Sequence, residues 1–171
     1  MSVLTTQRLT IRPPQPQDFD AFAAFCAADR SKWVGGPASR DEAREAFDSY
    51  LADAAAGTPS YLHITLTKTG DVIGRAGIRT MDHRPEPEVA YSLYTDAAEG
   101  HGYASEAAIA VRDWGYDVLG LTTLVSYIEP NNTKSAAVAT RMGAKPDGTA
   151  PGWDKHPDLI IFRHIAPEDR T

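Results

Sequence analysis

The chain has 171 residues, a formal net charge of −6 and 42% hydrophobic residues, a composition ordinary for a globular protein. This length predicts a single domain over residues 1–171, and the negative charge argues against a general nucleic-acid-binding surface. A single cysteine, Cys26, excludes an internal disulfide and a cysteine-based metal cluster. Because no apolar run could cross a bilayer and residues 1–8 have no signal-peptide core, we expect a cytoplasmic protein.

The first part of the chain predicts a strand followed by two helices. Residues 8–12 alternate polar and apolar side chains, as a half-buried strand does. Asp18 is expected to cap the first helix, and a loop is expected over residues 32–37. Ser39 with Glu42 three residues later has the pattern of a capping box that opens the second helix. Apolar side chains at helical spacing mark the buried faces: Phe19, Phe22, Ala23 and Cys26 in the first helix, and Ala43, Phe47, Tyr50, Leu51 and Ala54 in the second.

The middle of the chain predicts a β-hairpin, a further strand and a long helix. Residues 61–67 and 72–79 read as the two hairpin strands, with a Thr-Gly-Asp turn at 69–71. A third strand is expected over 89–94, and a helix over 103–118. The buried face of that helix is expected to hold Tyr103, Ala107, Ala110, Val111, Trp114 and Val118.

The last third of the chain predicts a strand over 122–128, a short helix over 133–142 and a final strand over 158–164. The order of elements is therefore a strand, two helices, three strands, a helix, a strand, a helix and a last strand. This order defines a mixed α/β domain with antiparallel strands early in the chain and a crossover helix late in it.

A glycine-rich turn, Glu-Gly-His-Gly-Tyr-Ala at 99–104, lies between the expected strand over 89–94 and the long helix. Such a turn leaves backbone N–H groups unpaired at the positive end of a helix, where a phosphate group binds well. A Rossmann dinucleotide site does not fit, since its turn follows the first strand and needs a third glycine and a later acidic residue. A P-loop does not fit either, because no Lys-Ser/Thr pair follows the last glycine.

Several further motifs stand in a fixed order around this turn. Gly-His-Gly-Tyr-Ala-Ser-Glu-Ala at 100–107 is followed by Ile-Glu-Pro-Asn-Asn-Thr-Lys-Ser at 128–135 and Arg-Met-Gly-Ala at 141–144. Leu-Thr-Thr-Gln-Arg-Leu-Thr-Ile-Arg at 4–12 and Gly-Arg-Ala-Gly-Ile at 74–78 precede them. With these motifs the chain resembles, over nearly its whole length, the GCN5-related N-acetyltransferase (GNAT) family, and within it the RimJ/RimL-like branch of ribosomal-protein N-terminal acetyltransferases.

The resemblance implies a GNAT fold: a single mixed, mostly antiparallel central sheet of six to seven strands, flanked by about four helices and splayed at the acyl-CoA site. It also implies acetyl-CoA as cosubstrate, no metal, and direct attack of an unprotonated amine on the thioester without an acyl-enzyme. The turn would bind the pyrophosphate, and the splayed strand would pair with the pantetheine arm. The residues implied to bind acetyl-CoA are Tyr91, Ser92, Leu93, Tyr94, Glu99, Gly100, His101, Gly102, Tyr103, Ala104, Asn132 and Ser135.

One residue of the turn departs from the family pattern, which has Gln or Arg where this chain has Glu99. A carboxylate beside a pyrophosphate is repelled unless it points away or pairs with a cation. His101 and the amides of the loop are the candidates to compensate this charge.

Asn132 and Ser135 are the first candidates for catalytic roles in the short helix. The resemblance implies that Asn132 binds CoA or holds the reaction geometry, and that Ser135 protonates the departing thiolate. Many members of the family use a tyrosine about two turns into this helix, where this chain has Ala139. Both residues are also good helix caps, and this structural interpretation stays open.

The reaction also needs a proton acceptor, because an amine near pH 7 is mostly protonated. Glu88 is the first candidate for this catalytic role, and His63 and His83 are alternatives with near-neutral intrinsic pKa values. Each of them could equally be a structural or solvated side chain. The resemblance places Trp33 and Trp153 in loops beside the acceptor channel, although a loop tryptophan can also cover the edge of a core.

We therefore expect an enzyme, an N-acetyltransferase that moves acetyl from acetyl-CoA to a primary amine. The amine is either a protein N-terminal α-amine or a small-molecule amine, and the acidic balance of the chain suggests a cationic acceptor. Glu99 and Ala139 favour an alternative, a catalytically degenerate GNAT domain that acts as an acyl-CoA sensor or regulatory module. A second alternative is an interaction domain in which the turn only begins a helix. We expect no nucleic-acid and no membrane partner, and both a monomer and a homodimer remain open.

Overall fold

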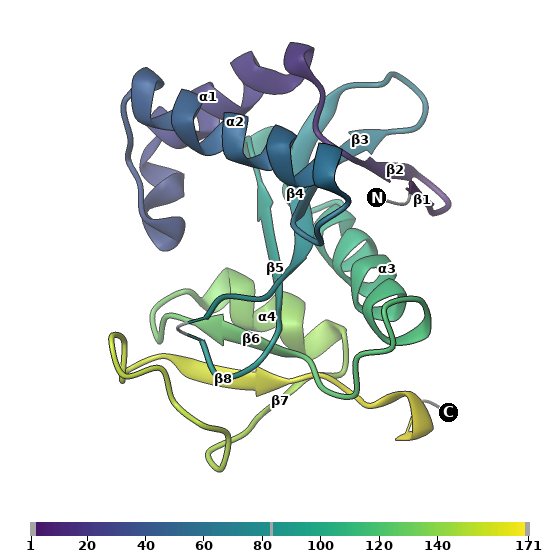
Figure 1. The fold of residues 1–171 in the computed structure, drawn as a ribbon, viewed down its shortest axis with the longest axis vertical. Helices are drawn as coiled ribbons and strands as arrows, with labels where there is room; N and C mark the ends of the chain where they lie inside the picture. The colour runs from purple at the N-terminus through teal and green to yellow at the C-terminus, as the bar shows by residue number, and fades with distance from the viewer. Residues whose placement is uncertain (1–2, 83, 170–171) are drawn as a thin grey trace.

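The computed structural model describes residues 3–82 and 84–169 as one eight-stranded sheet with helices on both of its faces (Figure 1). The order across the sheet is β1-β2-β3-β4-β5-β6-β8-β7, and all neighbours are antiparallel except the parallel pair β5 and β6. The strands are β1 (Leu4–Thr5), β2 (Leu9–Arg12), β3 (Tyr61–Leu66), β4 (Val72–Arg79), β5 (Glu88–Leu93), β6 (Val125–Ile128), β7 (Lys145–Pro146) and β8 (Ile160–Arg163). The helices are α1 (Phe19–Ala27), α2 (Arg40–Ala56), α3 (Tyr103–Asp117) and α4 (Thr133–Arg141), with short 3₁₀ helices η1 (Pro16–Asp18), η2 (Asp29–Val34), η3 (Asp96–Ala98) and η4 (Pro167–Asp169).

The predicted fold class is confirmed, and the differences are local. The sheet exceeds six to seven strands because β1 and β7 add two residues each, too few for an alternating pattern to reveal. The capping box of Ser39 and Glu42 opens α2 as predicted. Two other predictions are wrong in part: η2 covers residues 32–34 of the loop expected over 32–37, and Asp18 is the N-cap of α1 but makes no side-chain capping bond. Its carboxylate instead accepts two hydrogen bonds from the Arg12 guanidinium, at 2.7 and 2.8 Å.

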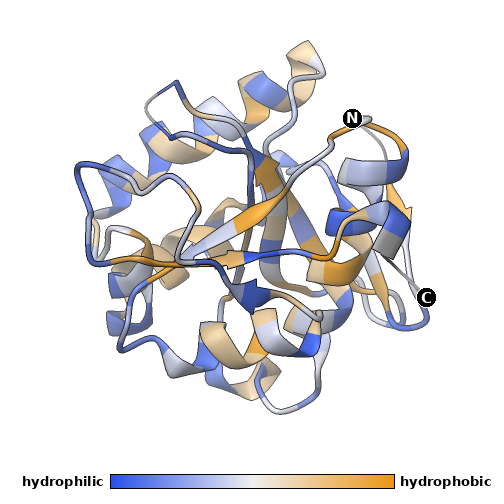
Figure 2. Ribbon diagram, turned by 90° about the horizontal axis from the view of Figure 1, so that it is seen from below, coloured by the Kyte–Doolittle hydropathy of each residue, from blue (hydrophilic) through white to orange (hydrophobic). Residues whose placement is uncertain are grey.

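The core has two main parts, one on each face of the sheet. On one face α3 packs against alternate residues of the strands, among them Leu62 and Ile64, while α1 and α2 cover the other face. Figure 2 shows the hydrophobic residues on the central strands and hydrophilic ones along the outer helices and loops. The predicted buried face of α3 is wrong at Val118, which is 66% exposed because the helix ends one residue earlier. Within the described ranges, no helix is long and apolar enough to cross a membrane.

The sheet separates between β5 and β6. These strands share a single residue pair, Glu88 with Val125, at the beginning of both strands. The Ser126 hydroxyl then donates a hydrogen bond of 2.7 Å to the Val89 carbonyl, where a strand amide would otherwise bind. Beyond this point the edge of β5 that faces β6 has no backbone partner from β6, so the strand is open to a ligand over its second half.

Candidate functional site

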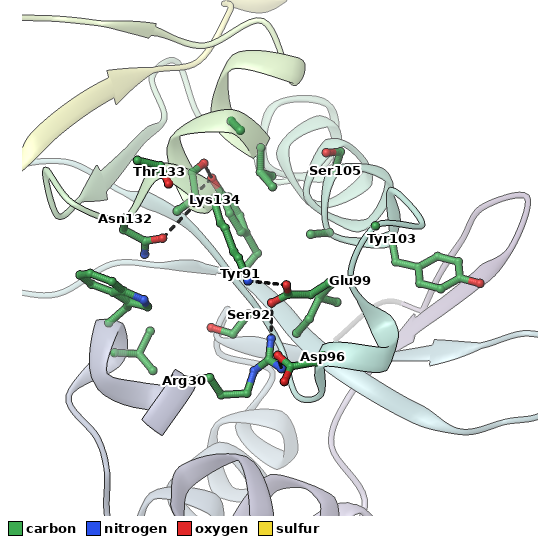
Figure 3. Close-up of a pocket in the computed structure, with 18 of the residues that line it drawn as sticks. Arg30, Tyr91, Ser92, Asp96, Glu99, Tyr103, Ser105, Asn132, Thr133 and Lys134 are labelled. Carbon is green, nitrogen blue, oxygen red and sulfur yellow. Dashed lines mark hydrogen bonds and ion pairs between the residues drawn. The ribbon is translucent and has the colours of Figure 1, made fainter. Parts of the chain in front are cut away.

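A cleft of about 1160 Å³ lies where β5 and β6 separate, between η2, the turn before α3 and the beginning of α4 (Figure 3). The structure brings most of the residues predicted to bind acetyl-CoA to this one cleft. Those that line it are Tyr91, Ser92, Leu93, Glu99, Gly100, Gly102, Tyr103, Ala104, Asn132 and Ser135. Tyr94 and His101 are outside its lining.

The turn before α3 has the backbone geometry of an anion site. Gly100 and Gly102 both have φ of +79°, a left-handed conformation that strongly favours glycine. Gly102 is the N-cap of α3 and offers no capping side chain, so the first amides of the helix have no acceptor within the helix. Arg8 donates a hydrogen bond of 2.9 Å to the His101 carbonyl, and neither residue lines the cleft.

Ser105 is a feature of the site that sequence reasoning missed. The residue lies in the first turn of α3 and lines the cleft, while it is only 9% exposed and its hydroxyl oxygen is buried. Among the described residues, this oxygen has no hydrogen-bond partner. A buried hydroxyl without a partner is costly, so a ligand could gain a hydrogen bond here if the side chain turned toward the cleft. The sequence could have pointed to Ser105, because its hydroxyl stands three residues after Gly102, the residue that begins the helix.

The structure pairs the Glu99 carboxylate with two cations. Lys134 Nζ lies 2.6 Å from one of its oxygens, and the Arg30 guanidinium binds the other. The hydrogen bond from Lys134 lowers the pKa of Glu99, so the carboxylate is ionised at neutral pH. His101, which the sequence offered as a compensating group, stacks its ring on Tyr103 with a centroid separation of 5.4 Å and lies outside the lining of the cleft. The ring of Tyr103 also points away from the other labelled side chains in Figure 3.

Asn132, Ser135 and Tyr91 form a hydrogen-bonded group on the α4 side of the cleft. The Asn132 side chain accepts a hydrogen bond of 3.1 Å from the Ser135 amide, so it caps α4 while lining the cleft. The Ser135 hydroxyl lies 3.3 Å from the Tyr91 hydroxyl, which donates to the Ser135 carbonyl at 2.9 Å. Burial raises the pKa of Tyr91 to about 12, so the phenol keeps its proton at neutral pH. The phenol also lies beside the backbone of Ala139, the position where many relatives have a tyrosine.

Glu88 is not brought to this group. It is 7% exposed, pairs with the Arg84 guanidinium and lies outside the lining of the cleft. The two loop tryptophans also separate: Trp33 of η2 lines the cleft and is 39% exposed. Trp153 instead packs its ring against Arg84, with a centroid distance of 4.4 Å, at a second and smaller groove.

His63, one of the two histidine alternatives for the proton acceptor, does not reach the cleft. His63 is 0% exposed, its Nδ1 lies 3.1 Å from the Asp18 carboxylate, and burial lowers the pKa of its ring. Its Nε2 lies 3.2 Å from the hydroxyl of Tyr94, which is itself buried. His63 therefore belongs to the core beneath α1 and α2, and the interpretation of this residue as a base is wrong. His83 lies outside the described residues.

The fold has a parallel pair of strands that splay apart, with an amide-lined turn at the gap between them. These two features define an α/β protein with an anion-binding cleft, and comparison with known families identifies its class. The profile of the family described as "Acetyltransferase (GNAT) domain" matches residues 8–145. The chain therefore belongs to the GNAT acetyltransferase family.

Individual proteins agree with this assignment over almost their whole length. The chain is 26% identical to the uncharacterized N-acetyltransferase p20 of Bacillus licheniformis, over 94% of this chain and 92% of the relative. A solved acetyltransferase from Agrobacterium tumefaciens str. C58 is 42% identical, with a TM-score of 0.86 over 96% of this chain and 95% of its own. RimL, a ribosomal L7/L12 α-N-protein acetyltransferase solved in complex with coenzyme A, has a TM-score of 0.77 at 15% identity, over 98% of this chain and 100% of its own. At that identity the likeness shows the fold alone.

Proposed function

We propose that the protein transfers acetyl from acetyl-CoA to a primary amine by direct attack in a ternary complex. The proposal is carried by one observation: the amide-lined turn, the open edge of β5 and the hydroxyls of Ser135 and Tyr91 all meet in a single cleft. The motifs at 100–107 and 128–135 favour the RimJ/RimL-like branch, and hence a protein N-terminal α-amine as acceptor. A small-molecule amine is the second acceptor class of the same proposal.

The cleft provides one place for each part of acetyl-CoA. The pyrophosphate would accept hydrogen bonds from the amides of the turn, where the α3 dipole adds positive charge. The pantetheine amides would pair with the open edge of β5 along Tyr91, Ser92 and Leu93. The unpartnered Ser105 hydroxyl would supply one more polar group on the α3 side if its side chain turned toward the cleft.

In the reaction, the amine nitrogen attacks the thioester carbonyl carbon and the carbon–sulfur bond breaks. The sulfur leaves with the electron pair of that bond and needs a proton. Ser135 is the proposed donor. The two hydroxyl oxygens are 3.3 Å apart, so the Tyr91 O–H, once turned from the Ser135 carbonyl, can return a proton to Ser135 and take its own replacement from water. The Tyr91 phenol is protonated at neutral pH, as a proton donor must be before it acts.

The attacking amine must lose a proton before or during attack. Glu88 remains our proposed acceptor for it. Because its carboxylate is ion-paired with Arg84 outside the lining of the cleft, the proton would reach it by way of water. Opening this ion pair would free one carboxylate oxygen for the water chain. Asn132 acts by holding the beginning of α4, and with it Ser135, in place.

The alternative, an acyl-CoA sensor without catalysis, is favoured by the carboxylate of Glu99 in the phosphate-binding turn. One experiment separates the two functions: release of free thiol from acetyl-CoA across N-terminal peptides, amino acids, polyamines and aminoglycosides, together with thermal unfolding in the presence of acetyl-CoA. Thiol release with one amine class supports the transferase and defines its acceptor. If acetyl-CoA stabilises the protein but releases no thiol with any amine, the sensor is supported. If acetyl-CoA neither stabilises the protein nor releases thiol, both functions are refuted.

A further inference from the structure

The charged groups at the mouth of the cleft come from three separate elements. Arg30 belongs to η2, Asp96 and Glu99 flank the turn before α3, and Lys134 belongs to the first turn of α4 (Figure 3). Arg30 binds Asp96 at 2.7 Å and also binds Glu99, whose second oxygen lies 2.6 Å from Lys134. Glu99 is therefore the shared partner of two cations that approach it from opposite walls of the cleft.

The two cations differ in how firmly they are held. The Arg30 side chain is 19% exposed and makes two ion pairs, so its guanidinium has a defined position. The Lys134 side chain is 76% exposed, and an exposed lysine–carboxylate pair contributes little free energy. Lys134 can therefore exchange its carboxylate partner for another anion at small cost, while Arg30 can exchange Glu99 and keep its ion pair with Asp96.

The ligand that the proposed function requires brings phosphate groups to this place. The turn that would bind the pyrophosphate begins at Gly100, directly after Glu99. A guanidinium binds phosphate through two parallel hydrogen bonds, and an ammonium binds it as a compact charge. A carboxylate held between such a pair of cations occupies the position that suits a phosphate group, and it must be displaced or left as a repelling neighbour when the phosphate binds.

We infer that Arg30 and Lys134 form a second phosphate-binding element for the nucleotide part of acetyl-CoA, and that Glu99 fills it as an internal carboxylate until the ligand displaces it. The inference rests on the proposed function. Arg30 and Lys134 then add affinity for the phosphates, while Glu99 subtracts from it. Glu99 thereby sets the affinity for the cosubstrate without touching the thioester.

The test measures the dissociation constants of CoA, dephospho-CoA and S-acetylpantetheine by calorimetry. The variants are Glu99→Gln, Arg30→Gln and Lys134→Gln. The controls are Arg40→Gln and Lys68→Gln, which remove one positive charge each outside the lining of the cleft. Thermal unfolding of each variant, without ligand, checks that the fold is intact.

We expect Glu99→Gln to bind CoA roughly three- to tenfold more tightly, and Arg30→Gln and Lys134→Gln to bind it more weakly by a similar factor, as partly exposed charge pairs do. S-acetylpantetheine lacks every phosphate, so its affinity should not change in any variant. Dephospho-CoA lacks the 3′-phosphate. If the substitutions change the Kd of dephospho-CoA as much as that of CoA, Arg30 and Lys134 bind the pyrophosphate. If they leave the Kd of dephospho-CoA unchanged, Arg30 and Lys134 bind the 3′-phosphate.

The same measurements can overturn the inference. Weaker CoA binding by Glu99→Gln would show that the carboxylate organises the site instead of competing for it. Equal changes for CoA and S-acetylpantetheine would show a structural effect on the whole cleft. If the unmodified protein binds CoA and the variants have the same Kd for CoA as the control variants, this inference fails while the proposed function stands. If the unmodified protein binds neither CoA nor S-acetylpantetheine, the proposed function fails with it.

Discussion

Replacement of Gly102 by alanine tests whether the turn before α3 is a phosphate site or only the beginning of a helix. Gly102 has φ of +79°, and a Cβ atom placed there would meet only the Arg8 Nη2 atom, at 3.5 Å, which is an ordinary contact. The substitution therefore acts through backbone strain and not through a clash. An alanine at this φ favours rotation of the peptide groups that aim the amides of the turn into the cleft.

The expected cost in stability follows from this conformation. A left-handed backbone costs a residue other than glycine roughly 1–2 kcal/mol, and the lower flexibility of the unfolded alanine chain offsets about 0.4–1 kcal/mol of it. We therefore expect Gly102→Ala to lower the free energy of unfolding by about 1 kcal/mol, or Tm by about 2–4 °C for a chain of this size.

The expected cost in binding is larger. Each hydrogen bond to a charged group contributes about 1.5–3 kcal/mol, so losing one amide–phosphate bond should raise the Kd of acetyl-CoA about tenfold to a hundredfold. Gly120 supplies a matched control, because its φ is +69°, nothing lies within 4 Å of a Cβ there, and it is outside the cleft. Gly120→Ala should show a similar loss of stability with an unchanged Kd, measured by calorimetry after thermal unfolding has confirmed the fold.

Equal Kd values for Gly102→Ala and Gly120→Ala would refute the reasoning. The left-handed glycine would then serve only to start α3, and the interaction-domain alternative would gain support. A stability loss of several kcal/mol in Gly102→Ala alone would also contradict it, since the structure shows no atom close enough to a Cβ to cause such a loss.

Further predictions concern the reacting groups and the pH dependence of stability. Ser135→Ala should lower kcat about a hundredfold with little change in the Kd of acetyl-CoA, whereas an unchanged kcat clears it of the acid role. Tyr91→Phe should lower kcat less than Ser135→Ala does, and its effect should vanish in the Ser135→Ala background. Glu88→Gln should remove the acidic limb of the pH profile of kcat/KM, and a retained limb would assign that proton to bulk water. Burial, with a smaller effect of Arg112, lowers the pKa of His164 to about 3, so the stability from its neutral ring is present above pH 6.5 and lost toward pH 3. By pH 5 the loss is about 2 kcal/mol, which should be missing in His164→Gln when urea unfolding at pH 7 and pH 5 is compared.

The sequence predicts those parts of the fold that local patterns determine. The alternation in β3 and β4, the turn between them and the capping box of α2 are formed by neighbouring residues, and they are found where the sequence places them. The predictions fail where a residue distant in the sequence determines the contacts of a side chain. Asp18 has the residue type of a helix cap, yet its carboxylate binds Arg12 and His63, which the antiparallel pairing of β2 with β3 brings side by side.

The candidate site divides in the same way. The glycine turn could be found from the sequence, since its conformation depends on its own glycines and on the helix that follows. Arg30 could not be found, because it reaches Glu99 from 69 residues away and lies in η2, where a loop was expected in part. Glu88 shows the opposite error, since its place at the beginning of β5 is as predicted while Arg84, four residues earlier, takes its carboxylate.

The structure changes the weight of the two sequence features that favour a catalytically degenerate domain. Glu99 was unfavourable as an unpaired charge beside a pyrophosphate, but its partners Arg30 and Lys134 can serve the phosphate in its place. Ala139 was unfavourable as a missing phenol, but the Tyr91 phenol from β5 lies beside the backbone of Ala139 and within 3.3 Å of the Ser135 hydroxyl. Each departure from the family pattern thus has a compensating side chain on another element. Compensation of Glu99 serves acyl-CoA binding, which the transferase and the sensor both need, so it does not separate the two functions. A phenol beside the Ser135 hydroxyl serves only the transfer reaction, so Ala139 gives the sensor alternative less support than it does in the sequence alone.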